Sequence, residues 1–260
     1  MTSTEGNDPP RDGLTDDRIL GGRVALWQPA EGYRVGLDAV LLAAATPARP
    51  GETVLDLGTG VGGVFLCLAA RIDDLHIAAV ELQADYAALA HANARRNSVE
   101  AAIVEADVAA LPASLRQRQF HHVVCNPPYF DRSLGSASPN SGRDIAFGGD
   151  TPIEVWIDAA ARRLRPKGQF TLIQRIERLP EVLTTLGGRL GSTQVLPLAA
   201  REGRAADRFI LSARKDGKAP FRMLAPMILH DGPAHLRDAE DYSRQVRAIL
   251  RDAAPLPLGD

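Results

Sequence analysis

The stretch Val54-Leu-Asp-Leu-Gly-Thr-Gly-Val-Gly-Gly63 decides the fold of this chain. Its apolar beginning is typical of a buried strand, and the glycines that follow are typical of a tight turn in which the backbone comes close to a ligand. The spacing of Gly58, Gly60 and Gly63 also satisfies the dinucleotide-binding fingerprint. The glycines therefore predict a strand, a ligand-binding turn and a helix, but they do not decide which cofactor binds.

Asp56 indicates the cofactor. It places a carboxylate two residues before Gly58, where it would repel a pyrophosphate and attract the cationic amino-acid end of S-adenosylmethionine. Glu81, which ends the next strand, is placed to accept hydrogen bonds from ribose hydroxyls, a role for an acid in either cofactor class. Asp107 ends the third strand and is placed to accept from the adenine amine. We therefore expect S-adenosylmethionine to bind here, with Leu82 beside Glu81 also among the cofactor-binding residues.

Strands and helices alternate on both sides of this motif. Strands are expected at 54–57, 76–81, 102–105, 121–125 and 169–174, and helices at 61–70, 84–97, 112–118, 153–164 and 179–186. Two consecutive strands, 194–198 and 208–213, and a helix at 238–251 follow. This order predicts an α/β fold with a doubly wound, mostly parallel sheet and an antiparallel strand near its C-terminal end. Ligands of such a sheet bind at the carboxyl ends of its strands.

The segment before the glycine motif is an appendage to this core. Residues 1–16 are polar and lack the features of a signal peptide, so we expect a disordered tail without a targeting function. The Gly21-Gly22 pair predicts a short hairpin, and a helix is expected from Asp38 to Ala45. Residues 17–50 are therefore expected to add a hairpin and a helix to a core domain over residues 51–260.

Composition and charge narrow the class of protein. Of 260 residues, 45% are hydrophobic and 24% charged, as in ordinary globular proteins, and no apolar run is long enough to cross a membrane. Cys67 and Cys125 lie in apolar surroundings without metal-ligand spacing, so we expect reduced core thiols, no metal and a cytosolic location. Residues 151–222 carry 14 Lys and Arg against 7 Asp and Glu. This positive block suits a polyanionic partner, although solvated helix faces give the same count.

The segment His121-His-Val-Val-Cys-Asn-Pro-Pro-Tyr-Phe130 indicates the reaction. An amine on an aromatic ring or an amide is a poor nucleophile because its lone pair is delocalised. Two acceptors for its two hydrogens, the Asn126 side-chain oxygen and the Pro127 carbonyl, favour a pyramidal nitrogen whose lone pair is aimed at a methyl group. Pro127 and Pro128 stiffen the segment and remove competing N–H donors. Catalysis is then expected to rest on alignment and electrostatics, without a general base.

Aromatic residues at the end of this segment and cationic residues after it are candidates for binding the acceptor. Tyr129, with Phe130 behind it, offers a flat face on which an extruded base can stack, contributing about 1–3 kcal/mol. Residues 131–150 have no periodicity and are expected to form a mobile substrate loop. The candidate phosphate contacts are all arginines: Arg132 and Arg143 in the loop, and Arg201, Arg204 and Arg208 after it. His121 and His122 are expected to be an exposed pair at a strand edge.

The chain resembles the amino-methylating class I methyltransferases, whose signature is Asn/Asp-Pro-Pro-Tyr/Phe, and more closely the bacterial tRNA(Val) adenine-N6 methyltransferases. The resemblance runs from about Ile19 to about Arg251. It rests on these motifs: Gly32-Tyr-Arg-Val-Gly-Leu-Asp-Ala-Val-Leu-Leu42, Asp56-Leu-Gly-Thr-Gly60, Val80-Glu81, Ala106-Asp107, Asn126-Pro-Pro-Tyr-Phe130 and Tyr242-Ser243. The resemblance implies a class I methyltransferase (Rossmann-like) fold, S-adenosylmethionine as cofactor and an adenine beside the tRNA anticodon as acceptor. It also implies that Gly36 and Asp38 cap the cofactor's methionine end.

Other functions stay open on the sequence. The Asn-Pro-Pro-Tyr motif also occurs in protein glutamine methyltransferases and in ribosomal-RNA guanine methyltransferases, so glutamine N5 or guanine N2 are alternative acceptors. The glycine spacing and Glu81 are also compatible with a nicotinamide oxidoreductase. An RNA-binding module without catalysis is a further alternative. We expect a cytoplasmic enzyme that acts on RNA, with tRNA favoured and a protein substrate not excluded.

Overall fold

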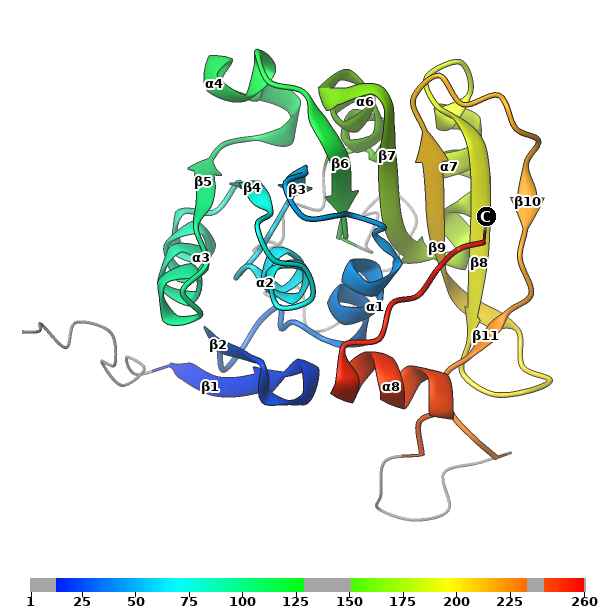
Figure 1. The fold of residues 1–260 in the computed structure, drawn as a ribbon, viewed down its shortest axis with the longest axis horizontal. Coiled ribbons are helices and arrows are strands. Elements are labelled where there is room, and N and C mark those ends of the chain that lie inside the picture. The colour runs from blue at the N-terminus through cyan, green and yellow to red at the C-terminus, as the bar shows by residue number, and fades with distance from the viewer. Residues whose placement is uncertain (1–12, 129–150, 233–240, 260) are drawn as a thin grey trace, which may run out of the picture.

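A computed structural model of the chain describes residues 13–128, 151–232 and 241–259. Its centre is a sheet of 9 strands (Figure 1). From one edge to the other, eight of these strands are β10 (Arg222–Met223), β8 (Gly191–Ala199), β9 (Ala206–Arg214), β7 (Leu164–Arg175), β6 (Phe120–Cys125), β3 (Thr53–Leu57), β4 (His76–Glu81) and β5 (Ala101–Glu105). The remaining strand, β11 (Met227–Ile228), also pairs with β8.

The strand directions confirm the expected doubly wound sheet. β3 is parallel to both β4 and β6, β5 is parallel to β4, and β7 is parallel to β6. β9 lies between β7 and β8 and is antiparallel to both. The carboxyl ends of β3, β4, β5 and β6 therefore meet at one edge, which is where the sequence motifs fall. The two-residue strands β10 and β11 were not expected.

Helices cover both faces of the sheet. One face packs against α1 (Leu37–Ala45), α2 (Gly63–Ala69), α3 (Ala84–Arg96) and α8 (Arg244–Asp252), and the other against α4 (Ala113–Arg116), α6 (Ile153–Arg163) and α7 (Leu179–Leu186). In Figure 1, α1, α2 and α8 lie in front of the sheet, and α6 and α7 lie behind it. Three short 3-10 turns also occur in the described ranges: η1 (Leu20–Gly22), η2 (Val108–Ala110) and η4 (Ile176–Arg178).

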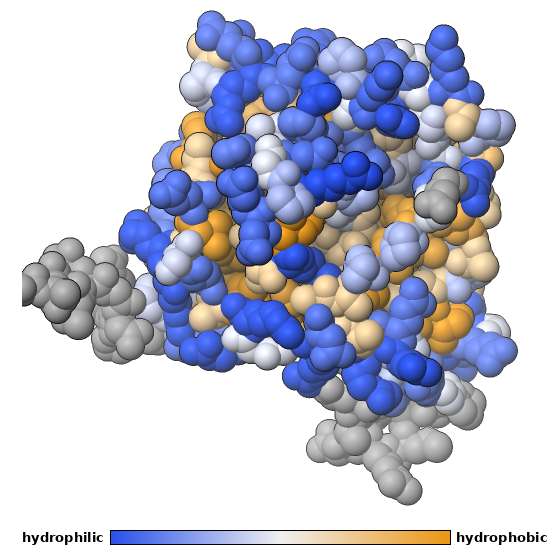
Figure 2. Space-filling model, viewed as in Figure 1, coloured by the Kyte–Doolittle hydropathy of each residue, from blue (hydrophilic) through white to orange (hydrophobic). Residues whose placement is uncertain are grey.

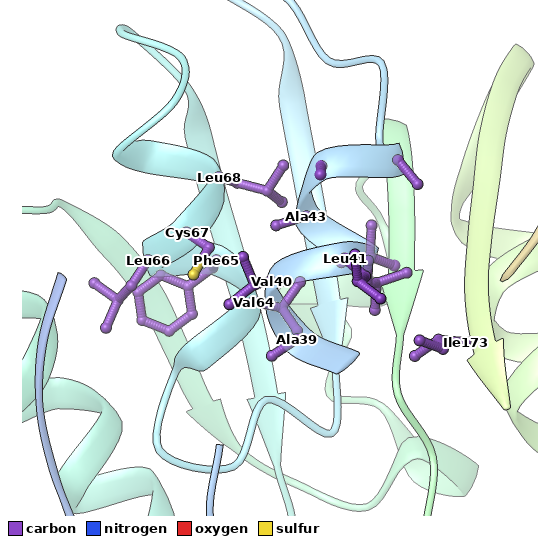
Figure 3. Packing of buried hydrophobic residues seen from close by; sticks show 14 of the residues in the cluster. Ala39, Val40, Leu41, Ala43, Val64, Phe65, Leu66, Cys67, Leu68 and Ile173 are labelled. Carbon is purple, nitrogen blue, oxygen red and sulfur yellow. The ribbon is translucent and has the colours of Figure 1, made fainter. Parts of the chain in front are cut away.

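The two core layers follow from strand alternation. Successive strand side chains point to opposite faces, so Val54 and Val124 belong to the layer under α1 and α2, whereas Leu55 and Val123 belong to the layer under α6. Both layers are closed to solvent. In Figure 3, small and branched side chains of α1 face those of α2, which brings these helices close together. The buried face of α1 thereby fixes the segment that precedes it against the glycine turn.

The N-terminal hairpin is confirmed, with β1 (Leu14–Ile19) antiparallel to β2 (Val24–Pro29). Because β1 begins at Leu14, residues 14–16 belong to the hairpin and not to the tail in which the sequence analysis placed them; residues 1–12 lie outside the described part. Asn93 on α3 and Asn97, which directly follows that helix, attach the hairpin to the core. Their amides exchange hydrogen bonds of 2.7–2.9 Å with the backbone of β2, at Trp27 and Ala25.

The last helix begins later than expected. The sequence analysis started it at Asp238, but α8 starts at Arg244, where the Ser243 side chain accepts a hydrogen bond from the Val246 N–H. Tyr242 instead forms an antiparallel bridge with His230. A serine that caps the first turn ends the helix on its N-terminal side, so the periodicity before Ser243 was misleading.

The surface of the protein is largely polar and its cysteines are buried. Figure 2 shows hydrophilic side chains over much of one face, with hydrophobic ones between them across its middle. Cys67 and Cys125 are free and buried, as expected, and burial raises the pKa of the Cys67 thiol to about 12. In the described ranges, every helix is too short or too polar to span a bilayer.

Candidate active site

A pocket lies at the carboxyl ends of β3, β4, β5 and β6. Its lining residues come from the glycine turn, the following strand ends, the Asn-Pro-Pro segment and the segment before α1: Gly32, Tyr33, Gly58, Gly60, Glu81, Leu82, Gln83, Tyr86, Asp107, Val108, Asn126, Pro127, Pro128, Thr151 and Trp156. The two motifs found in the sequence, about 70 residues apart in the chain, therefore line one pocket.

The glycine turn is shaped so that only glycine fits. Gly58 and Gly60 have φ angles of +69° and +58°, in the left-handed region that other residues rarely adopt. The N–H groups of Gly58 and Thr59 both donate to the Val80 carbonyl at 2.9 Å, which holds the turn against β4. A Cβ at Gly58 would lie 2.6 Å from the Trp156 ring. The absence of a side chain at Gly58 thus lets the Trp156 ring pack directly against the turn.

Two acids line the pocket beside the turn. Glu81 is buried, and its two carboxylate oxygens accept from the Gly60 N–H at 2.8 Å and the Gln83 N–H at 2.9 Å. The Asp107 carboxylate accepts from the Ala109 N–H at 2.8 Å and caps η2. Because a carboxylate oxygen has more than one lone pair, both acids keep acceptor capacity. Backbone N–H groups therefore hold both carboxylates at the pocket.

Asp56 lies beneath the pocket and not in its lining. Its Oδ2 accepts from the Thr59 hydroxyl at 2.7 Å, and the Phe65 backbone N–H also acts on the carboxyl group, although the buried Oδ1 forms no hydrogen bond of normal geometry in the described part of the chain. Burial raises the pKa of Asp56 to about 7, and the negative charge of Glu81 acts in the same direction. A carboxyl group in this state gains from a nearby cation.

Gly36 and Asp38 are close to the pocket but outside its lining. Gly36 is the residue before α1, and Asp38 lies in the first turn of that helix. The Asp38 carboxylate forms an ion pair with the Arg208 guanidinium on β9. Arg208, a candidate phosphate contact, is therefore engaged within the protein.

The Asn-Pro-Pro segment follows β6 directly and is contacted by two other segments. Asn126 donates from its side-chain Nδ2 to the Tyr33 hydroxyl at 3.1 Å. The Pro127 carbonyl accepts from the side-chain Nε2 of Gln174 on β7 at 3.4 Å. Burial raises the pKa of Tyr33 well above its ordinary value, and the charges of Asp38 and Asp56 add to this effect. The Tyr33 hydroxyl therefore stays protonated.

Several of these residues escaped the sequence analysis. Tyr33 lay inside a quoted motif without being singled out, and Tyr86, Trp156 and Gln174 carry no motif that would have identified them. The predicted residues Tyr129, Phe130, Arg132 and Arg143 lie outside the described residues.

The remaining candidates among the charged residues are placed away from the pocket lining. Arg201 is paired with Asp241, and Arg204 is exposed. The expected exposed histidine pair is wrong for His122, which is buried in the middle of the sheet and hydrogen-bonded to Glu52 at 2.8 Å. Within the described ranges, His, Cys, Asp and Glu side chains form no group of three or more that suits a metal ion.

Residues 34–197 match the family model of the methyltransferase small domain. The chain belongs to this family of methyltransferases. A tRNA1(Val) (adenine(37)-N6)-methyltransferase of Shewanella halifaxensis is 34% identical over 194 residues, which cover 72% of this chain and 77% of the relative. Another of the same name, from Actinobacillus pleuropneumoniae serotype 7, is 34% identical over 185 residues, with 69% and 75% covered.

Solved structures agree with this membership. A predicted O-methyltransferase from Agrobacterium tumefaciens has a TM-score of 0.68 and 26% identity, with 85% of this chain and 98% of that chain covered. The T. thermophilus 16S rRNA N2 G1207 methyltransferase, solved with AdoMet and guanosine, has a TM-score of 0.56 and 25% identity, with 78% and 50% covered. The family and the fold make this chain a methyltransferase of the S-adenosylmethionine-dependent class.

The pocket residues fit that cofactor. Gly58 and Gly60 line the pocket with backbone that carries no side chain, and Glu81 and Asp107 supply acceptors for hydroxyl and amine donors. The Asp56 carboxyl group beneath the turn, whose pKa burial raises to about 7, would ionise beside a cationic group. This set of acceptors suits a cofactor that carries a ribose, an adenine amine and an ammonium group.

Proposed function

We propose that this chain transfers a methyl group from S-adenosylmethionine to the exocyclic N6 amine of an adenine in tRNA, as a cytoplasmic enzyme. The observation that carries the proposal is the shared pocket of Asn126, Pro127 and the Gly58–Gly60 turn. Methyl donor and amine acceptor must meet at one point, and this pocket contains residues suited to each. The name of the relatives, tRNA1(Val) (adenine(37)-N6)-methyltransferase, supports adenine and tRNA as the acceptor.

Assignments for the cofactor follow from the chemistry of the pocket lining and of the residues next to it. Glu81 is assigned to the ribose hydroxyls, Asp107 to the adenine amine, and Leu82 to apolar contact beside them. The charge of Asp56, together with Gly36 and Asp38 before and within α1, is assigned to the methionine end. When bound, S-adenosylmethionine supplies a methyl group on a sulfonium that needs no further activation.

Asn126 and Pro127 are assigned to the acceptor amine. Their two oxygens would each accept one of its hydrogens, which favours a pyramidal nitrogen with a directed lone pair. Pro128 keeps the backbone rigid, because its ring fixes φ and it has no N–H to compete for the same acceptors. The proton leaves to solvent after transfer, since Asn126 is not a base.

Residues outside the described ranges complete the proposal. Tyr129 is assigned to stacking on the adenine, with Phe130 behind it, and Arg132 and Arg143 to phosphate contacts of the RNA. Stacking of a base on an aromatic ring contributes about 1–3 kcal/mol. An adenine in a single-stranded loop reaches such a slot at a lower unstacking cost than one in a duplex.

The test is nucleoside mass spectrometry of tRNA from a strain that lacks the gene, with complementation by the wild type and by Asn126→Ala. We expect one N6-methyladenosine to disappear in the deletion strain and to return only with the wild type. Unchanged N6-methyladenosine in every tRNA would reject the proposal. Loss of N2-methylguanosine from ribosomal RNA, or of methylglutamine from a protein, would assign the same chemistry to another acceptor.

A nicotinamide oxidoreductase and an RNA-binding module without catalysis are separated by calorimetry on the purified protein. We expect S-adenosylmethionine to bind and NADH not to bind. Tight NADH binding without S-adenosylmethionine binding would favour the oxidoreductase. RNA binding without either cofactor would favour the non-catalytic module.

A further inference from the structure

Cations gather at the amino edge of the sheet, at the other end of the strands from the proposed active site. β6 and β7 are parallel and begin side by side, with Phe120 opposite Leu164. β9 is antiparallel to β7, so its end at Arg214 lies beside the start of β7, opposite Gln169. In Figure 1 the arrowhead of β6 points down and that of β9 points up, so this edge lies along the top.

Six exposed cations lie on the segments that meet there, and together they form the amino-edge surface: Arg116, Arg118, Arg165, Lys167, Arg214 and Lys218. The Arg214 Nε donates to the Lys167 carbonyl at 3.1 Å, which joins the end of β9 to the start of β7. The Arg163 Nη1 donates to the Leu115 carbonyl at 3.1 Å, which joins the end of α6 to α4. The segments that carry the six cations therefore adjoin one another.

Carboxylates do not neutralise the amino-edge surface. A groove between the start of β7 and the turn after β9 has these charged lining residues: Lys167, Arg214, Asp216 and Lys218, three cations against one acid. In the described part of the chain, none of the six cations forms an ion pair with a carboxylate. Burial lowers the pKa of the nearby Arg163, and the positive charges of Arg162 and Arg116 act in the same direction. The surface therefore carries a positive charge that the described residues leave uncompensated.

Two neighbouring cations serve the fold, whereas the six exposed ones are available to a partner. Arg163 and Lys215 are partly buried and donate to carbonyls at the ends of α4 and α6, where the helix dipole favours a cation. The Arg118 guanidinium lies over the Phe120 ring, so it is held in place without losing its charge. Exposed guanidinium and ammonium groups of this kind are the usual donors to phosphate oxygens.

The distance between this surface and the pocket suits an RNA that contacts both. β6 has 6 residues, and a strand rises about 3.3 Å per residue, so the amino edge lies about 20 Å from the Asn-Pro-Pro segment. A duplex has about one phosphate per 3.4 Å in each strand, so a stem that begins at the acceptor loop reaches this edge within about six base pairs. One molecule then contacts both ends of the sheet, which favours RNA over an acidic protein as the partner.

We propose that the amino-edge surface binds backbone phosphates of the RNA substrate, away from the acceptor adenine. The inference rests on the proposed function, because it assigns the surface to the same RNA. Phosphate contacts fix the position of a nucleic acid without reading its bases. The surface should therefore contribute to the Kd and the KM for tRNA and leave kcat unchanged.

The test is a triple variant with Arg116→Gln, Lys167→Gln and Lys218→Gln. In the described part of the chain these three side chains form no hydrogen bond, so the fold should be retained. The Kd for tRNA should rise at least about tenfold at near-physiological salt. The slope of log Kd against log salt should fall by about two to three, because three phosphate contacts are lost. The kcat at saturating tRNA and the Kd for S-adenosylmethionine should change less than about twofold.

Two control variants separate local charge from other effects. The first, with Arg18→Gln, Arg95→Gln and Arg244→Gln, removes three exposed arginines from the hairpin, α3 and α8. It lowers the net charge equally and should leave the Kd for tRNA within about threefold of the wild type. The second, with Arg116→Lys, Lys167→Arg and Lys218→Arg, keeps the charge and should stay within about twofold. Fluorescence anisotropy with labelled tRNA at several salt concentrations measures all four proteins.

The outcomes separate this inference from the proposed function. If the wild type methylates tRNA and the triple variant equals it in Kd and salt slope, the inference alone is overturned, and the surface serves another partner such as an acidic protein. Equal weakening by the first control also overturns it, because the effect would then come from net charge. If the wild type binds tRNA through this surface without methylating it, the proposed reaction is overturned and the surface stands. A wild type that neither binds nor methylates RNA overturns both.

Discussion

The side-chain amide of Gln174 donates a hydrogen bond to the Pro127 carbonyl, with 3.4 Å between nitrogen and oxygen. Gln174 is 1% exposed, and its own Oε1 accepts from the Arg175 N–H at 2.8 Å. Its amide is thus fixed by backbone on one side and holds the Pro127 carbonyl on the other. A carbonyl oxygen has two lone pairs, so one remains for the acceptor amine.

Gln174→Met should therefore reduce methyl transfer. Methionine has a similar size but no donor, so the Pro127 carbonyl loses the contact that orients it. We expect kcat to fall about threefold to tenfold, the value of one hydrogen bond, with little change in cofactor affinity. Single-turnover methylation of tRNA measures the rate of methyl transfer, and calorimetry measures the affinity for the cofactor.

Gln169→Met is the matched control. Gln169 lies on the same strand, and its Nε2 donates to the Ser212 hydroxyl at 2.6 Å, away from the pocket lining. It should lower stability by about 1 kcal/mol without changing kcat. An equal loss of kcat in both variants would show that the effect comes from β7 as a whole and not from the Pro127 carbonyl.

The elements that the sequence predicted well have strong local causes. The strand from His76 to Glu81 and the helix from Leu179 to Leu186 have the predicted ends, because an apolar run and an amphipathic period each end at a clear change of residue type. The helix at 238–251 was extended too far because its charged residues are compatible with a helix, whereas the Tyr242–His230 bridge is a long-range contact. Pairings of two residues, such as β10, leave no periodicity to detect.

The site was predictable where chemistry requires a motif. The glycine turn, Glu81, Asp107 and Asn126 lie at one edge of the sheet, as expected, because parallel strands bring their ends together. Gln174 was not identified, because the sequence does not distinguish a functional glutamine in an apolar strand from one that is merely solvated or hydrogen-bonded within the core. The Asp38–Arg208 ion pair joins residues 170 positions apart, and nothing in local sequence indicates such a partner.

Gly58→Ala should impair both folding and cofactor binding. The new Cβ would meet the Trp156 ring at 2.6 Å, and its backbone would keep a φ of +69° that alanine disfavours. We expect a loss of stability of about 2–4 kcal/mol and a cofactor affinity lowered by more than about tenfold. Denaturant unfolding and calorimetry measure these effects.

Gly203→Ala separates the backbone strain from the clash. Gly203 has a φ of +72°, and a Cβ there would meet nothing within 4 Å. Gly203→Ala should lower the free energy of unfolding by about 1–2 kcal/mol and leave cofactor affinity unchanged. If Gly58→Ala cost no more than this control and bound the cofactor normally, the close approach of Trp156 would have no role.

Cofactor affinity should rise as the pH increases through about 7. Asp56 has its pKa raised by burial to about 7, so it changes from neutral to ionised in this range, and only the ionised form attracts an ammonium group. Calorimetry between pH 6 and pH 8 should show a several-fold rise in affinity that Asp56→Asn lacks. Equal pH profiles for both proteins would remove Asp56 from the methionine end.

The same group gives the opposite trend for the stability of the protein without cofactor. A carboxyl whose folded-state pKa is raised binds protons more tightly when folded, so its contribution to the free energy of unfolding falls from about pH 4 to about pH 7. Asp56→Asn cannot ionise and should lose less stability over this interval than the wild type. Denaturant unfolding at pH 5 and pH 8 gives the difference.

Asn126→Ala should abolish most turnover while cofactor affinity stays within about twofold. Truncation removes one of the two proposed acceptors for the amine, and loss of one such preorganised polar group costs on the order of 100-fold in kcat. The hydrogen bond of the Asn126 side chain is to Tyr33 and not to Gly58, Glu81 or Asp107. These three cofactor-binding residues should therefore keep their positions when the side chain is removed. Single-turnover methylation and calorimetry on the same preparation separate the two effects. Comparable losses of turnover and cofactor binding would mean that Asn126 supports the pocket and does not orient the amine.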